Sequence, residues 1–144
     1  MSKTEIALGL FRSGFSCSQA VFAAFAGDFG LDRETALRIS QPFGGGIAAT
    51  GDWCGALTGA FLVAGLRHGR VRPEDTAAKD KTYALVRDLI ARFAADRGGT
   101  RCRDLLGCDI GTPEGSRKAN ELKLHETKCE DFVAGAVALL EELL

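Results

Sequence analysis

The chain has 144 residues, of which 46% are hydrophobic and 26% are charged, and its formal net charge is −1 at pH 7. This length is typical of one domain, residues 1–144, and the near-neutral charge argues against a nucleic-acid-binding surface. The longest apolar stretch, residues 53–66, is too short to span a bilayer, and no secretory signal peptide is visible. We therefore expect a cytoplasmic protein with no nucleic-acid partner and no membrane span.

The N-terminal third carries three helix-start signals. Ser2 and Ser16 each open a capping box, in which a glutamate or glutamine follows three residues later. A third helix is expected after Asp32 and should end near Pro42, because the residue before a proline disfavours helical geometry. No segment alternates with period two for long. The sequence predicts an all-α, single-domain helical bundle of about six to seven helices.

The stretch 44–60 begins with three consecutive glycines and becomes an apolar segment. With Asp52 or Thr50 as its N-cap, the next helix would run from Trp53 to about His68 and would hold Cys54 in its first turn. Unpaired N–H groups and the helix dipole at that end favour an anion such as a thiolate. The glycine loop is therefore expected to position a reactive or ligating sulfur.

Small residues mark one face of this apolar helix. Gly51, Gly55 and Gly59 recur every fourth residue. Such a face lets a neighbouring backbone approach closely, so we expect another helix to pack against it.

The second half of the chain continues the helical pattern. A long helix is expected from about Pro73 to Gly98, and its core stripe should consist of Tyr83, Val86, Leu89, Ile90 and Phe93. A short helical turn over 100–107 and a polar surface segment over 112–123 should follow. A capping box over 127–130 should begin the last helix.

Four of the five cysteines lie one or two residues after a predicted N-cap. They are Cys17, Cys54, Cys102 and Cys129, after Ser16, Asp52, Thr100 and Thr127 respectively. The first turn of a helix can lower a thiol pKa, and the two arginines flanking Cys102 should act in the same direction. Cys108 follows a glycine at a helix end or in a loop.

A structural interpretation competes with this pattern, because free cysteine often behaves as a small buried hydrophobe. The spacing contains no Cys-x-x-Cys of a thioredoxin-like site or zinc ribbon. His125 precedes Cys129 by four residues and would share its face on a continuous helix. The predicted cap at Thr127 interrupts that helix, so we expect His125 on the surface.

The chain resembles a family of small proteins named for the pattern Cys…Cys-Gly-Ala-x-x-Gly…Cys…Cys, whose members are described as redox-active. The resemblance covers nearly the whole chain, and its matching pieces are 14–21, 43–46, 54–59, 102–107, 112–115 and 129–133. It implies that Cys17, Cys54, Cys102 and Cys129 are the four family cysteines and that Cys108 is additional.

Two chemistries fit four converging thiols. Pairs can cycle between dithiol and disulfide, or all four thiolates can bind zinc or an iron–sulfur cluster. A non-catalytic helical interaction protein is the third alternative. We favour the redox interpretation, a thiol-based oxidoreductase in which Cys54 attacks and Cys17 or Cys102 resolves. Its partner would be a redox protein or a small oxidant, and the glycine face together with the segment after Thr112 leaves room for a homodimer.

Overall fold

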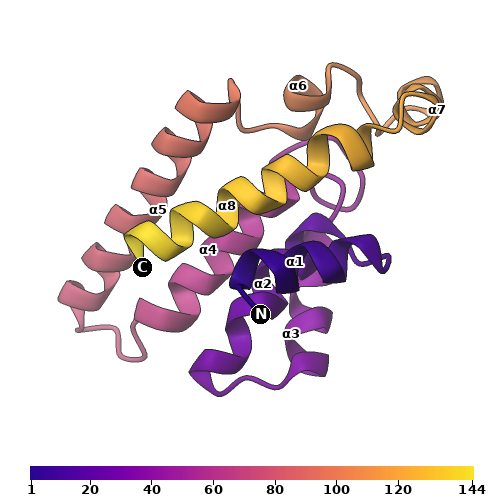
Figure 1. The fold of residues 1–144 in the computed structure, drawn as a ribbon. Coiled ribbons are helices and arrows are strands. Elements are labelled where there is room, and N and C mark those ends of the chain that lie inside the picture. Colours follow the sequence, from indigo (N-terminus) through magenta and orange to yellow (C-terminus); the bar gives the residue numbers. More distant parts are fainter.

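The computed structural model describes residues 1–144 and contains eight α-helices (Figure 1). Their bounds are α1 Lys3–Arg12, α2 Cys17–Ala26, α3 Arg33–Ser40, α4 Gly55–His68, α5 Thr76–Arg97, α6 Cys102–Leu106, α7 Pro113–Glu121 and α8 Glu130–Leu143. Two 3₁₀ turns follow α2 and α3, at Gly27–Phe29 and Gln41–Phe43, and a π-helical turn, His125–Cys129, leads into α8. There are no strands, which confirms the predicted all-α class.

The first three helices begin where the capping signals predicted. The Ser2 and Asp32 side chains accept the backbone N–H groups of Glu5 and Thr35 at 3.1 and 3.0 Å. At the start of α2, Ser16 forms a reciprocal capping box with the residue three positions later. These caps satisfy N–H groups that a helix start would otherwise leave unpaired.

The core is built around α4, which contacts α2, α5 and α8. The predicted close approach is confirmed between α4 and α2. A Cβ on Gly59 would lie 2.8 Å from the carbonyl oxygen of Ser18, and one on Gly55 would lie 3.3 Å from the Cβ of Cys17. The glycines therefore allow the start of α2 to rest directly on α4.

The long helix differs from its prediction in two respects. It begins at Thr76 and not near Pro73, because the Asp75 side chain caps it by accepting a backbone N–H at 3.1 Å. Tyr83, expected in the core, is 51% exposed, and the buried stripe is Leu85, Leu89 and Phe93. This stripe faces α4 and α8, the two helices that α5 packs against.

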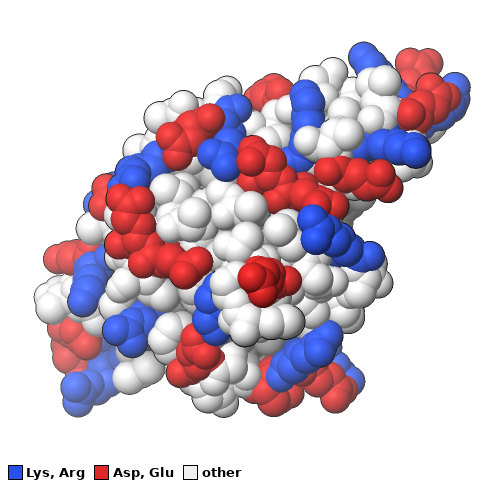
Figure 2. Space-filling view, in the orientation of Figure 1, with Lys and Arg blue, Asp and Glu red and all other residues white.

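The surface carries both signs of charge. Figure 2 shows Lys and Arg intermixed with Asp and Glu over the visible face, as the formal net charge of −1 suggests. No helix combines the length and the apolar character that crossing a bilayer requires.

Candidate functional site

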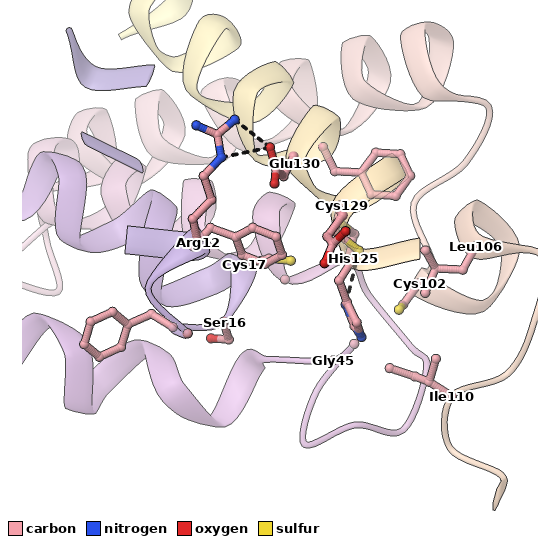
Figure 3. A pocket seen from close by; sticks show the side chains of 18 residues that line it. Arg12, Ser16, Cys17, Gly45, Cys102, Leu106, Ile110, His125, Cys129 and Glu130 are labelled. Atoms are coloured by element: carbon pink, nitrogen blue, oxygen red, sulfur yellow. Dashed lines mark hydrogen bonds and ion pairs between the residues drawn. The ribbon is translucent and has the colours of Figure 1, made fainter. Parts of the chain in front are cut away.

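A cavity of about 570 Å³ lies between the start of α2, the glycine loop, α6 and the turn before α8 (Figure 3). The four cysteines that the sequence singled out all line it: Cys17, Cys54, Cys102 and Cys129. Cys108 is not part of its wall. The cavity therefore brings together thiols from four separate segments of the chain.

Cys17 and Cys129 both line the cavity, and each shifts the pKa of the other. Cys17 is the first residue of α2, immediately after the Ser16 cap, as predicted. Hydrogen bonding between the two thiols is the largest cause that raises the pKa of Cys17 well above its ordinary value and lowers that of Cys129.

His125 is the second group that acts on Cys129. Its Nδ1 lies 3.7 Å from the Sγ of Cys129, and its side chain lines the cavity. Hydrogen bonding and the charge of His125 lower the pKa of Cys129 further, while burial opposes both effects. In return, the hydrogen bond to Cys129 raises the pKa of His125. The pair has the character of a thiolate beside an imidazolium.

This arrangement corrects two predictions about the last helix. Thr127 is not an N-cap: its hydroxyl donates to the carbonyl oxygen of Lys123 at 3.1 Å. The π-helical turn runs without interruption into α8, so Cys129 lies inside a continuous helical segment. His125 is exposed, as predicted, and its Nδ1 faces the sulfur of Cys129 across this turn.

Cys54 and Cys102 are held together by a short antiparallel bridge between Trp53 and Arg101. The N–H of Cys54 donates to the carbonyl oxygen of Thr100 at 2.8 Å, and the N–H of Cys102 donates to that of Asp52 at 2.6 Å. Two segments far apart in the chain thus meet at the cavity wall.

The same bridge explains why the predicted caps of these two helices are wrong. Cys54 is itself the N-cap of α4, and Arg101 is the N-cap of α6. The backbones of Asp52 and Thr100 are engaged in the bridge, and the Thr50 hydroxyl donates to carbonyl oxygens of the preceding loop. Tertiary pairing therefore overrides the local capping preference.

The environments of Cys54 and Cys102 do not favour thiolates. Burial raises the pKa of Cys54 to about 11, although the backbone N–H groups of Leu57 and Ala56 partly oppose it. Burial, followed by the charges of neighbouring cysteines, raises the pKa of Cys102 to about 12. The expectation that flanking arginines lower the pKa of Cys102 is wrong, and one of them, Arg101, pairs with Asp52 at 3.3 Å. Of these three thiols, Cys129 is thus the one whose surroundings lower its pKa.

The glycine loop that forms one wall has an unusual conformation. Five consecutive residues, Gly45 to Ala49, have φ between +49° and +71° and form a left-handed turn. Three of them are not glycines, and left-handed geometry costs such residues roughly 1–2 kcal/mol each. The turn places Gly46 so close to Cys102 that a Cβ on Gly46 would lie 2.8 Å from the Cβ of Cys102. Strain of this kind tends to accumulate beside functional sites.

The four sulfurs share a cavity without forming a metal cage. No group of three or more His, Cys, Asp or Glu side chains is arranged to hold a metal ion. The cavity also contains residues that sequence analysis did not single out, among them Arg12, Glu126 and Glu130. No local pattern marks the pairing of Arg12 with Glu130, because the two meet only through the fold, at 2.7 Å.

Comparison with known proteins identifies one relationship. A family model described as "Putative redox-active protein (C_GCAxxG_C_C)" matches residues 15–143, a range that includes all four cavity cysteines. The family name has Gly-Cys-Ala at its centre, which corrects the order Cys-Gly-Ala given for it above; Cys54-Gly55-Ala56 is the order in this chain. No curated protein and no solved structure matches the chain.

Proposed function

The chain belongs to the C_GCAxxG_C_C family, whose members are described as redox-active, and from this premise we propose that it performs thiol–disulfide exchange through Cys129 and Cys17. Cys129 is the attacking thiolate, and Cys17 is the thiol that resolves the mixed disulfide. The dithiol gives up two electrons and two protons, and the partner disulfide becomes two thiols.

The observation that carries this proposal is that Cys17, Cys129 and His125 line one cavity, with the Nδ1 of His125 3.7 Å from the sulfur of Cys129. Hydrogen bonding to Cys17 and to His125 lowers the pKa of Cys129, whereas the pKa of Cys17 is raised. An attacking thiolate with a neighbouring resolving thiol is the arrangement that disulfide exchange requires. Cys54 and Cys102, whose pKa values are raised to about 11 and 12, stay protonated at neutral pH in this scheme. The proposal assigns the protein to a reducing compartment such as the cytoplasm, where cysteines are kept as thiols.

The metal-binding alternative has weaker support. Zinc and iron–sulfur clusters need several thiolates directed at one centre, and the cysteines are not arranged in that way. A purely structural role would leave unexplained the pairing of Cys129 with both a thiol and an imidazole.

Mild oxidation with diamide tests the proposal. The wild-type protein should lose two of its five free thiols, and peptide mapping should recover Cys17 joined to Cys129. The C54S variant should lose the same two thiols, whereas C129S should lose none at the same oxidant concentration. Metal and sulfide analysis of anaerobically purified protein accompanies the assay. A stoichiometric metal that protects the thiols until it is chelated would replace this proposal with the metal-binding alternative.

A further inference from the structure

The depth of Cys129 limits what can react with it. The residue is only 5% exposed, and its access is through the cavity of about 570 Å³. This volume is in the range of small-molecule sites, roughly 300–1,000 Å³. A disulfide on the surface of a folded protein would have to enter this cavity to meet the sulfur. The geometry therefore favours a small substrate.

The walls define the shape and polarity of that substrate. Phe11, Phe15 and Phe132 line the cavity together with Leu106 and Ile110, so much of the lining is apolar. Short carbon arms on either side of a sulfur–sulfur bond would lie against these side chains. The apolar contact would hold the disulfide beside Cys129 without requiring specific hydrogen bonds.

The charged side chains of the cavity determine which substituents on the two sulfurs of a disulfide it accepts. Four titratable side chains other than cysteine line it: Arg12, His125, Glu126 and Glu130. Arg12 donates two hydrogen bonds to Glu130, at 2.7 and 3.1 Å, and His125 faces the sulfur of Cys129. Glu126 has no ion pair. Among the residues that line the cavity, Glu126 is thus the charged side chain without a charged partner, while Lys128, outside the wall, donates to the carbonyl oxygen of Leu105.

We propose that the cavity is a substrate site for low-molecular-weight disulfides with neutral or cationic arms, and that Glu126 disfavours anionic ones. The assignment rests on the proposed function and adds the substrate class. Glu126 is a specificity residue here, because it contacts no reacting atom.

The exchange balances with the groups present. The Cys129 thiolate attacks one sulfur of RSSR, the substrate S–S bond breaks, and the released RS⁻ takes a proton from the His125 imidazolium. Cys17 then attacks the sulfur of Cys129 in the mixed disulfide and passes its own proton to the second RS⁻. The products are a Cys17–Cys129 disulfide, neutral His125 and two RSH molecules, so the substrate gains the two electrons that the cysteines lose.

The C17S variant allows the formation of a mixed disulfide on Cys129 to be measured. The substitution removes the resolving thiol while keeping a hydroxyl donor in its place, so the mixed disulfide on Cys129 should accumulate and be seen by mass spectrometry. Three probes share a two-carbon arm and differ in its terminal group and charge: bis(2-hydroxyethyl) disulfide, cystamine and 3,3′-dithiodipropionate. We expect adducts on Cys129 from the first two to form at least about fivefold faster than from the anionic probe.

A second substitution separates the role of Glu126 from the intrinsic reactivity of the probes. In C17S/E126Q the rate with the anionic probe should rise about threefold and that with cystamine should fall by a similar factor, as expected for one exposed charge interaction. The rate with the neutral probe should not change. The matched control is C17S/E121Q, which alters an exposed glutamate outside the cavity and should leave all three rates unchanged.

Failure of this assignment is distinguishable from failure of the proposed function. If diamide joins Cys17 to Cys129 in the wild type but none of the three probes modifies Cys129 in C17S, the substrate class is wrong and thiol exchange stands. Adducts on Cys54, Cys102 or Cys108 in place of Cys129, or rates that do not respond to E126Q, also overturn the assignment. If neither diamide nor the probes react with Cys129, both proposals fall.

Discussion

His125 and Cys129 occupy the two ends of one π-helical turn, with Nδ1 3.7 Å from Sγ. Single π-helical turns are rare and frequently occur at functional sites. Because both residues belong to the same turn, their separation does not depend on the docking of one helix onto another. The imidazole can therefore influence this sulfur even when the rest of the cavity rearranges during a reaction.

Replacing His125 should raise the pKa of Cys129, because it removes a hydrogen bond and a positive charge that lower that pKa. In H125N we expect alkylation of Cys129 by iodoacetamide at pH 6.5 to be about tenfold slower, the size of effect expected for one charge-assisted hydrogen bond. The two proteins should react equally at a pH where both carry the thiolate. H68N, which changes the other histidine of the chain, is the control and should behave as wild type.

The thiol of Cys17 should be the larger influence on the same pKa. C17A removes the donor, whereas C17S keeps a hydroxyl in its place. We expect the pH midpoint of Cys129 alkylation to lie below the roughly 8.5 of a free cysteine in wild type and C17S, and to rise in C17A. Equal midpoints in C17S and C17A would show that the hydrogen bond does not set the reactivity of Cys129.

Alkaline pH should destabilise the reduced protein through its buried thiols. The folded-state pKa values of Cys54 and Cys102 are raised, to about 11 and about 12. Their stabilising contribution is therefore complete below the pKa of an unfolded thiol and is lost as the pH rises through these folded values. Each thiol should contribute a slope of about 1.4 kcal/mol per pH unit in that window. Urea unfolding at pH 7 and pH 10.5 measures this loss, and C54A should show a smaller one.

Two glycines of α4 offer a matched test of the close contact with α2. A Cβ on Gly59 would lie 2.8 Å from a backbone oxygen of Ser18, whereas one on Gly65 would meet nothing within 4 Å. G59A should lower the free energy of unfolding by about 1–3 kcal/mol. G65A should raise it by up to about 1 kcal/mol, because alanine favours a helix interior. Urea unfolding of both variants at neutral pH distinguishes packing from helix propensity.

The left-handed loop can be tested with two glycines of positive φ. Gly46 and Gly30 have φ of +71° and +81°, but only the Cβ of an alanine at position 46 would collide, with Asp52 and Cys102. Both G46A and G30A should lose roughly 1–2 kcal/mol of stability from left-handed strain. G46A should in addition displace Cys102 and increase its alkylation at neutral pH, whereas G30A should leave all the thiols unchanged. Peptide mapping after iodoacetamide treatment reads out the difference.

Local interactions explain which parts of the fold were predictable. The starts of α1, α2 and α3 depend on a serine or aspartate bonding to backbone a few residues away, so Ser2, Ser16 and Asp32 could be identified from sequence. The close approach of another helix to α4 followed from the spacing of Gly55 and Gly59, because glycines have no side chain to keep a neighbouring backbone away, but the spacing did not identify that helix as α2.

Long-range pairing explains what could not be predicted. The caps of α4 and α6 were misplaced because the Trp53–Arg101 bridge, which no local pattern marks, fixes both segments. The pairing of His125 with Cys129 was visible as a four-residue spacing but was discounted in favour of a cap at Thr127. The relative pKa values of the cysteines depend on burial and on partners from other segments, so a low pKa was expected at Cys54 from its position in the chain, whereas the pKa that is lowered is that of Cys129.

The Trp53–Arg101 bridge also pairs the segment just before α4 with the segment that follows α5. The chain through α4 and α5 therefore begins and ends at the cavity wall. The connection between those helices, residues 69–75, lies outside the cavity wall and is largely exposed. A fluorescent reporter could be inserted in this connection while the two bridged segments stay paired. Such an insertion should leave the cavity wall, and the thiol chemistry proposed for it, unchanged.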